Sequence, residues 1–140
     1  MHTAANLLVR ILLDPACAAC GTALERPLES PVCAACWAGV PAVATPWCAR
    51  CGDHLSTWRV DEAECARCRR HPPAFSVARS AGRHDGSLRQ IIHAFKYEHR
   101  RALAEPLARL MLEAGGLVLD GADAVVPVPT LLLRRLQRGF

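Results

Sequence analysis

The sequence predicts two parts: a small cysteine-rich domain built of β-ribbons, followed by the N-terminal part of an α/β domain. All eight cysteines lie between Cys17 and Cys68. The second half of the chain instead shows apolar residues at helical spacing and then a continuous apolar segment. With 51% apolar and 21% charged residues, the composition is that of a globular protein and not of a disordered one.

Residues 1–15 are predicted to form a short amphipathic helix. Leu7, Leu8, Ile11 and Leu12 fit one helical face, and Arg10 interrupts the apolar run. No small-residue cleavage site follows, so a secretory signal is not predicted, and no run is long enough for a membrane span. We therefore expect a cytoplasmic protein, in which dense cysteines serve metal or redox chemistry more often than disulfides.

The cysteines are spaced as four Cys-x-x-Cys pairs. Twelve residues separate the first two pairs and thirteen separate the last two. One Cys-x-x-Cys turn can direct two sulfurs at one ion, and two such turns complete a tetrahedral zinc site. The pattern predicts a double zinc ribbon over residues 16–72 with two structural Zn²⁺ ions, whose binding supplies much of the folding energy. The expected ligands are Cys17, Cys20, Cys33, Cys36, Cys48, Cys51, Cys65 and Cys68.

An internal repeat indicates which pairs share an ion. Gly21 and Gly52 follow the leading pairs of two similar segments, and no glycine follows the trailing pairs. We therefore expect the first pair to join the second and the third to join the fourth, with a crossed arrangement left open. Disulfides and thioredoxin-like redox pairs are the alternative interpretations. His54 and His71 are expected to be surface residues, because each site already has four thiols.

The second part, residues 73–140, is predicted to be an incomplete α/β domain. We expect a strand over residues 75–83, a helix opened by a Ser87-x-x-Gln90 capping box, and a helix that starts near Pro106 and stops at residues 115–116. Residues 124–129 are predicted to form a buried strand. One strand cannot complete a parallel sheet, so we expect the chain to be a truncated version of a longer protein.

Basic residues concentrate around the junction of the two parts. Residues 65–101 hold nine Lys or Arg against two acidic residues, which favours phosphate-bearing partners. The predicted nucleic-acid-binding residues are Arg67, Arg69, Arg70, Arg100 and Arg101. Trp37, Trp47 and Trp58 could stack on bases, or could pack over the zinc sites.

Several motifs follow the cysteines in a specific order. They are Ala81-Gly82-Arg83-His84-Asp85-Gly86-Ser87-Leu88-Arg89-Gln90, Phe95-Lys96-Tyr97, Val126-Pro127-Val128-Pro129 and Arg134-Arg135-Leu136-Gln137-Arg138-Gly139-Phe140. Together with the four cysteine pairs, they closely resemble the ComF family. That family comprises bacterial competence proteins with a double zinc ribbon before a type I phosphoribosyltransferase-like domain.

The resemblance implies a role in natural competence and DNA uptake, handling single-stranded DNA in the cytoplasm, with other competence proteins as partners. It also implies a fold that binds phosphoribosyl pyrophosphate, with Mg²⁺ only if a longer chain exists. The positions that match its phosphate-binding stretches are Lys96, Pro129, Thr130, Arg134, Arg135 and Arg138. The alternative is that these are solvated surface charges.

One departure from the family bears on enzymatic activity. The family's loop of two acidic residues followed by Thr-Gly-x-Thr has no match in this sequence. We therefore assign no catalytic residue and leave open whether the protein is an enzyme. A phosphoribosyltransferase, if the chain continues, and a non-catalytic zinc-ribbon interaction module or fragment are the alternative functions.

Overall fold

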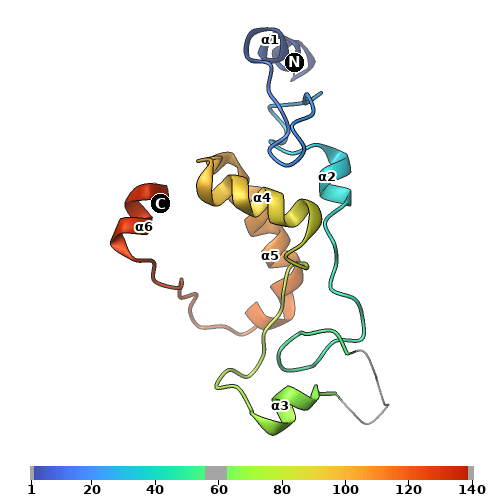
Figure 1. Cartoon of the computed structure of the whole chain (residues 1–140), viewed down its shortest axis with the longest axis vertical. Coiled ribbons are helices and arrows are strands. Elements are labelled where there is room, and N and C mark those ends of the chain that lie inside the picture. The colour runs from blue at the N-terminus through green and yellow to red at the C-terminus, as the bar shows by residue number, and fades with distance from the viewer. Residues whose placement is uncertain (1, 56–62, 139–140) are drawn as a thin grey trace. The chain divides into compact units, whose positions relative to one another are not determined.

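A computed structural model describes residues 2–55 and 63–138 (Figure 1). The elements, in chain order, are α1 (His2–Leu13), α2 (Ala34–Ala38), α3 (Ala66–Arg70), α4 (Gly86–Tyr97), the 3₁₀ turn η1 (Arg101–Leu103), α5 (Ala104–Leu119) and α6 (Leu132–Arg138). The described part of the chain contains no β-strand longer than a bridge. The predicted β-ribbons are wrong in this respect, since each is reduced to one antiparallel bridge, Ala16 with Ala23 and Trp47 with His54.

The chain forms two compact units. The first contains Met1–Pro41, His84–Leu107 and Pro127–Phe140, and the second contains Ala42–Arg83 and Ala108–Val126. Four of the eight cysteines belong to each unit. The segment boundaries that the sequence places at residues 15 and 72 remain predictions.

The core of the first unit joins the first cysteine segment to α4. Leu24 and Val32 from the cysteine segment are buried together with Ile91 of α4 and Leu103 of η1. Helix α2 packs on α4 (Figure 1). The predicted amphipathic pattern of α4 is confirmed, because the buried residues of the helix, Ile91 among them, recur at helical spacing on one face. This core therefore packs the first cysteine group against α4.

The N-cap of helix α4 lies two residues earlier than the predicted capping box places it. Asp85 is the N-cap, and its carboxylate accepts a hydrogen bond from the backbone N–H of Gly86 at 2.8 Å. The predicted capping box at Ser87 is wrong, since Ser87 lies inside the first turn. Its hydroxyl oxygen is buried without a hydrogen-bond partner among the described residues. Both Asp85 and Ser87 suit a cap, and the first one along the chain is used.

Helix α5 continues through the two glycines that were predicted to end it. Pro106 occupies the first turn as expected, where its missing N–H costs no hydrogen bond. The helix runs to Leu119, and the N–H of Asp120 still bonds to the carbonyl of Gly116. Each glycine costs only about 1 kcal/mol relative to alanine, so Gly115 and Gly116 weaken the helix without stopping it.

Neither predicted strand forms. Residues 75–83 are irregular, and residues 124–129 are extended and exposed, with Val125, Val126 and Val128 at 81%, 83% and 89% exposure. A strand of a parallel sheet needs neighbouring strands to bond and cover it, and the described residues supply none. The phosphoribosyltransferase-like sheet is therefore not seen in the described residues.

The N-terminal helix α1 presents its apolar face outward. Leu8, Ile11 and Leu12 are between 59% and 73% exposed, whereas Asn6 on the opposite face is 5% exposed. The side-chain oxygen of Asn6 accepts a hydrogen bond from the backbone N–H of Leu28 at 3.1 Å, which ties the helix to the first cysteine segment. No described helix is long and apolar enough to cross a membrane.

Candidate functional site

The first group of four thiols has the dimensions of a zinc site. The Sγ atoms of Cys17, Cys20, Cys33 and Cys36 all lie within 4.8 Å of one another, and those of Cys20 and Cys33 are 3.8 Å apart. A regular tetrahedron of sulfurs about 2.3 Å from a central zinc ion has edges of about 3.8 Å. These four side chains therefore fit one Zn²⁺ ion.

The second group repeats this geometry. Cys48, Cys51, Cys65 and Cys68 gather within the same 4.8 Å, with the Cys51 and Cys65 sulfurs 3.8 Å apart. The structure thus pairs first with second and third with fourth, and the crossed arrangement is excluded. His54 lies outside both groups and places Nδ1 3.1 Å from the carbonyl oxygen of Ala44. His71 also lies outside them.

The repeat seen in the sequence is also a repeat of backbone hydrogen bonds. In each leading turn, the glycine N–H bonds to the carbonyl of the first cysteine at 2.9 Å, and the N–H of that cysteine bonds forward across the turn at 2.8 Å. Gly21 and Gly52 have φ of +73° and +72°, which favours glycine. The forward acceptors are the carbonyls of Thr22 and Asp53.

Each trailing pair starts a short helix. Cys33 is the N-cap of α2 and Cys65 is the N-cap of α3, both with extended backbone. Their N–H groups donate to the leading sulfurs, from Cys33 to Cys17 at 3.3 Å and from Cys65 to Cys48 at 3.2 Å. Such bonds stabilise the charge that a thiolate must carry to bind zinc.

Within each group, the thiols differ in how readily they ionise. In the first, hydrogen bonding to the Thr22 side chain lowers the pKa of Cys20 to about 6, whereas burial and the neighbouring thiols raise the pKa of Cys36 well above its usual range. In the second, burial opposes ionisation of Cys48, but backbone N–H groups outweigh it and lower its pKa to about 6. Burial and then the neighbouring thiols raise the pKa of Cys68 to about 12. Four thiolates this close need a bound cation to neutralise them.

The surroundings of the two zinc sites differ. The first opens onto a cavity of about 850 Å³ that Cys20, Cys33 and Cys36 help to line, and Cys20 is exposed. At the second, Cys48 and Cys68 are buried, and the N–H of Ala78 bonds to the carbonyl of Arg50 at 2.7 Å. The second turn is thus covered by a segment of chain that has no counterpart in the repeat.

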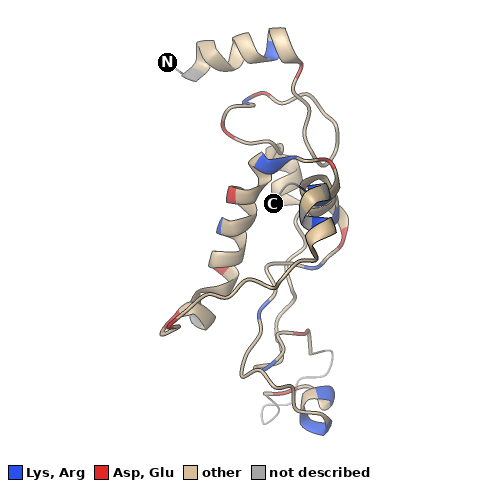
Figure 2. Cartoon of the chain, turned by 90° about the vertical axis from the view of Figure 1, so that its left-hand side faces the viewer, with Lys and Arg blue, Asp and Glu red and all other residues tan. Residues whose placement is uncertain are grey.

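Basic residues surround the second zinc site. Arg67, Arg69 and Arg70 lie on α3 and are exposed, and Figure 2 shows this basic helix. The guanidinium of Arg67 is 3.5 Å from the Asp53 carboxylate, and hydrogen bonding to the Cys51 sulfur raises the pKa of Arg67. Arg67 therefore helps to neutralise the sulfur cluster. Arg69 and Arg70 follow it on the same short helix.

The other predicted nucleic-acid residues lie elsewhere. Arg100 and Arg101 are exposed in the first unit, where Arg100 precedes η1 and Arg101 is its first residue. Trp37 packs against the first core and donates from Nε1 to the Ser30 hydroxyl at 3.2 Å, so it is a structural residue. Trp47 is 43% exposed in the second unit. Trp58 lies outside the described residues.

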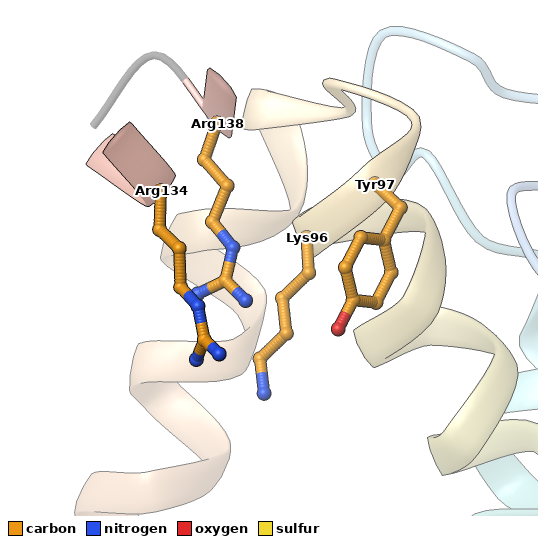
Figure 3. Close-up of a pocket in the computed structure, with 4 residues that line it drawn as sticks. All are labelled: Lys96, Tyr97, Arg134 and Arg138. Atoms are coloured by element: carbon orange, nitrogen blue, oxygen red, sulfur yellow. The ribbon is translucent and has the colours of Figure 1, made fainter. Parts of the chain in front are cut away.

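Three of the predicted phosphate-binding residues meet at one cavity (Figure 3). Lys96 from α4 and Arg134 and Arg138 from α6 line a cavity of about 350 Å³, together with Tyr97. The guanidinium carbon of Arg138 lies over the Tyr97 ring, 5.6 Å from its centroid. Tyr97 was missed from the sequence, although it stands next to Lys96 and one helical turn after His93.

The remaining predicted positions are not part of this cavity. Pro129 and Thr130 are exposed and do not line it. The side chain of Arg135 lies outside the described part of the structure, as do Gly139 and Phe140 of the C-terminal motif. A phosphate role for these positions stays a prediction from the family resemblance.

Comparison with known proteins supports the metal sites. Residues 8–69 match the double zinc ribbon domain family. The chain is 32% identical over 83 residues to the DNA utilization protein YhgH of Salmonella typhi and to that of Salmonella typhimurium. The match covers 54% of this chain but only 36% of each relative's length. No solved structure matches the chain significantly. The cysteine segment is therefore a double zinc ribbon with two four-cysteine sites.

Proposed function

We propose that this protein acts in DNA uptake and handles single-stranded DNA in the cytoplasm, with the second zinc ribbon as a binding surface. The observation that carries the proposal is the exposed arginines of α3, placed directly on a four-cysteine zinc site. The relatives named as DNA utilization proteins support it, since they are 32% identical to this chain over 83 residues. Other competence proteins are proposed as partners on the basis of the family resemblance.

The zinc site gives these arginines a fixed platform. Cys65 is the N-cap of α3 and Cys68 is its middle residue, so the start and the middle of the helix are held by metal ligands. Guanidinium groups on a rigid element can contact successive phosphates without a large loss of side-chain freedom. Cations at the end of a helix also interact favourably with its dipole, and this alone would account for Arg69 and Arg70. The two explanations differ in whether DNA binding depends on these residues.

Trp47 offers bases an exposed aromatic partner in the same unit. Trp47 precedes Cys48 and its backbone forms the bridge with His54, so this residue is held at the turn that carries Cys48. Stacking on an aromatic ring contributes about 1–3 kcal/mol per base and tolerates any sequence. A basic helix together with one stacking residue suits binding to single strands with little sequence preference.

Binding of a fluorescent single strand to the zinc-loaded chain tests the proposal. The variant R69Q/R70Q leaves Arg67 to support the zinc site and should weaken binding. It should also lower the slope of log affinity against log salt by about 0.7 for each lost phosphate contact. The control R10Q/R89Q removes the same charge from exposed positions on α1 and α4 and should bind as the parent does. The same affinity for R69Q/R70Q and the parent would rule out α3 as the surface.

A second test concerns the basic residues of the first unit. The variant R100Q/R101Q removes the remaining predicted nucleic-acid residues, and a loss comparable to that of R69Q/R70Q would assign a DNA contact to the first unit as well. Phosphoribosyl transfer is an alternative function, implied by the family resemblance if the chain continues. Turnover of phosphoribosyl pyrophosphate by the purified 140-residue chain would establish it.

A further inference from the structure

We infer that the cavity between α4 and α6 binds the terminal phosphate of a DNA strand, as a phosphate monoester. The inference rests on the proposed function, because it gives the single strand a second contact in the first unit. The ligand class follows from the three cations that line the cavity, Lys96, Arg134 and Arg138.

The charge of the cavity calls for an anion. No carboxylate is found among the described residues that line it, so the three cations are not neutralised from within its wall. Repulsion between the three like charges raises their electrostatic energy, and a bound anion would lower it. Figure 3 shows the Lys96 ammonium and both guanidinium groups directed into one space. A guanidinium group can donate two parallel hydrogen bonds to the oxygens of one phosphate group, whereas the Lys96 ammonium contributes a point charge.

Tyr97 holds one of these groups in position. The ring of Tyr97 packs against the His93 ring on α4, with centroids 4.9 Å apart, and Arg138 lies over it. A cation over an aromatic face is attracted to it, so Tyr97 limits the orientations available to the Arg138 guanidinium. Tyr97 is thus a positioning residue, and its ring is already engaged by two neighbours.

The size and chemistry of the cavity favour a terminal phosphate over an internal one. At about 350 Å³ it lies at the small end of ligand pockets, so it suits a phosphate group that enters end-on. A phosphate monoester carries a charge of about −1.5 to −2 at pH 7, whereas an internal diester carries only −1. Three converging cations discriminate in favour of the larger charge. The described lining offers no carboxylate for a metal ion, so the phosphate is recognised by direct contact.

Single strands of one sequence, with a 5′-phosphate, a 3′-phosphate or no terminal phosphate, provide the test with the zinc-loaded chain. We expect at least one phosphorylated strand to bind about tenfold more tightly than the unphosphorylated strand. The variants K96Q and R134Q should lose this preference and keep the affinity for the unphosphorylated strand. R89Q, which removes a charge from α4 outside the cavity, should keep both. Circular dichroism and zinc content confirm that each variant is folded.

The outcomes separate this inference from the proposed function. Binding of the unphosphorylated strand reports on the ribbon surface, and the difference between strands reports on the cavity. Equal affinity for all three strands would overturn the inference while leaving DNA binding intact, as would a preference that survives in R134Q. Competition by inorganic phosphate, with no preference among strands, would assign the cavity to small phosphates and overturn the strand-end assignment.

Discussion

The carbonyl oxygen of Ala78 lies 2.7 Å from the position that a Cβ atom would occupy on Gly52. The equivalent position on Gly21 has no atom within 4 Å, although both glycines have nearly the same positive φ. The two zinc turns therefore have the same backbone conformation, but only the second is covered by another segment of the chain. Replacing each of the two glycines by alanine thus provides a matched pair of variants.

Gly52→Ala should weaken the second zinc site more than Gly21→Ala weakens the first. Both replacements incur the cost of a left-handed conformation, about 1–2 kcal/mol. Only at Gly52 must the segment carrying Ala78 also move, which breaks its hydrogen bond with Arg50. Thermal unfolding of the zinc-loaded variants measures the difference, and equal losses for the two would show that the covering segment contributes nothing.

Removing zinc should unfold both ribbons. Among the residues that the structure describes, the core of the second unit buries Cys48, Leu55 and Cys68, of which only Leu55 is not a metal ligand. A core this small cannot offset the loss of chain entropy, whereas structural zinc contributes about 10–16 kcal/mol at pH 7. Limited proteolysis after treatment with a strong chelator should cleave within residues 16–70.

The remainder of the first unit provides the internal comparison. Helix α4 has caps and an apolar face of its own, and should be cleaved more slowly than the ribbons in the same digestion. An unchanged cleavage pattern after complete loss of zinc would contradict a metal-dependent fold.

Zinc affinity should fall as pH falls, and zinc binding should release protons. At pH 7, Cys20 and Cys48 are largely thiolates because their pKa values are about 6, whereas the raised pKa values of Cys36 and Cys68 keep these thiols protonated. Zinc must therefore displace at least one proton from each group. Below pH about 6 the affinity should fall more steeply, since Cys20 and Cys48 also take up protons. Calorimetry in buffers of different protonation enthalpy counts the released protons, and a buffer-independent heat would exclude proton release.

The metal sites could be predicted from the sequence because their determinants are local. A Cys-x-x-Cys turn fixes the relative position of two sulfurs whatever surrounds it, and the repeated Gly21 and Gly52 indicated which turns belong together. The helical face around Ile91 was predictable for the same reason, since spacing along one helix decides which side is apolar.

The failures concern features decided by distant parts of the chain. Residues 124–129 have the composition of a buried strand, but burial depends on neighbouring strands that local pattern cannot supply. Lys96 and Arg138 are far apart in sequence, and only the packing of α6 near α4 places both at one cavity. The predicted phosphate residues were identified by family resemblance, and no pattern of spacing joined them to Tyr97.

Asp85→Ala should destabilise the first unit, and Ser87→Ala should not. Asp85 caps α4 through its side chain, and loss of such a cap costs about 1 kcal/mol. The Ser87 hydroxyl is buried without a partner among the described residues, so its removal eliminates an unfavourable burial and should leave stability within about 0.5 kcal/mol or raise it. Asp85→Asn retains an acceptor and should recover most of the loss. Chemical denaturation of the zinc-loaded chain compares the three variants. If Ser87→Ala proved the more damaging, the capping box expected from the sequence would be the cap that operates in solution.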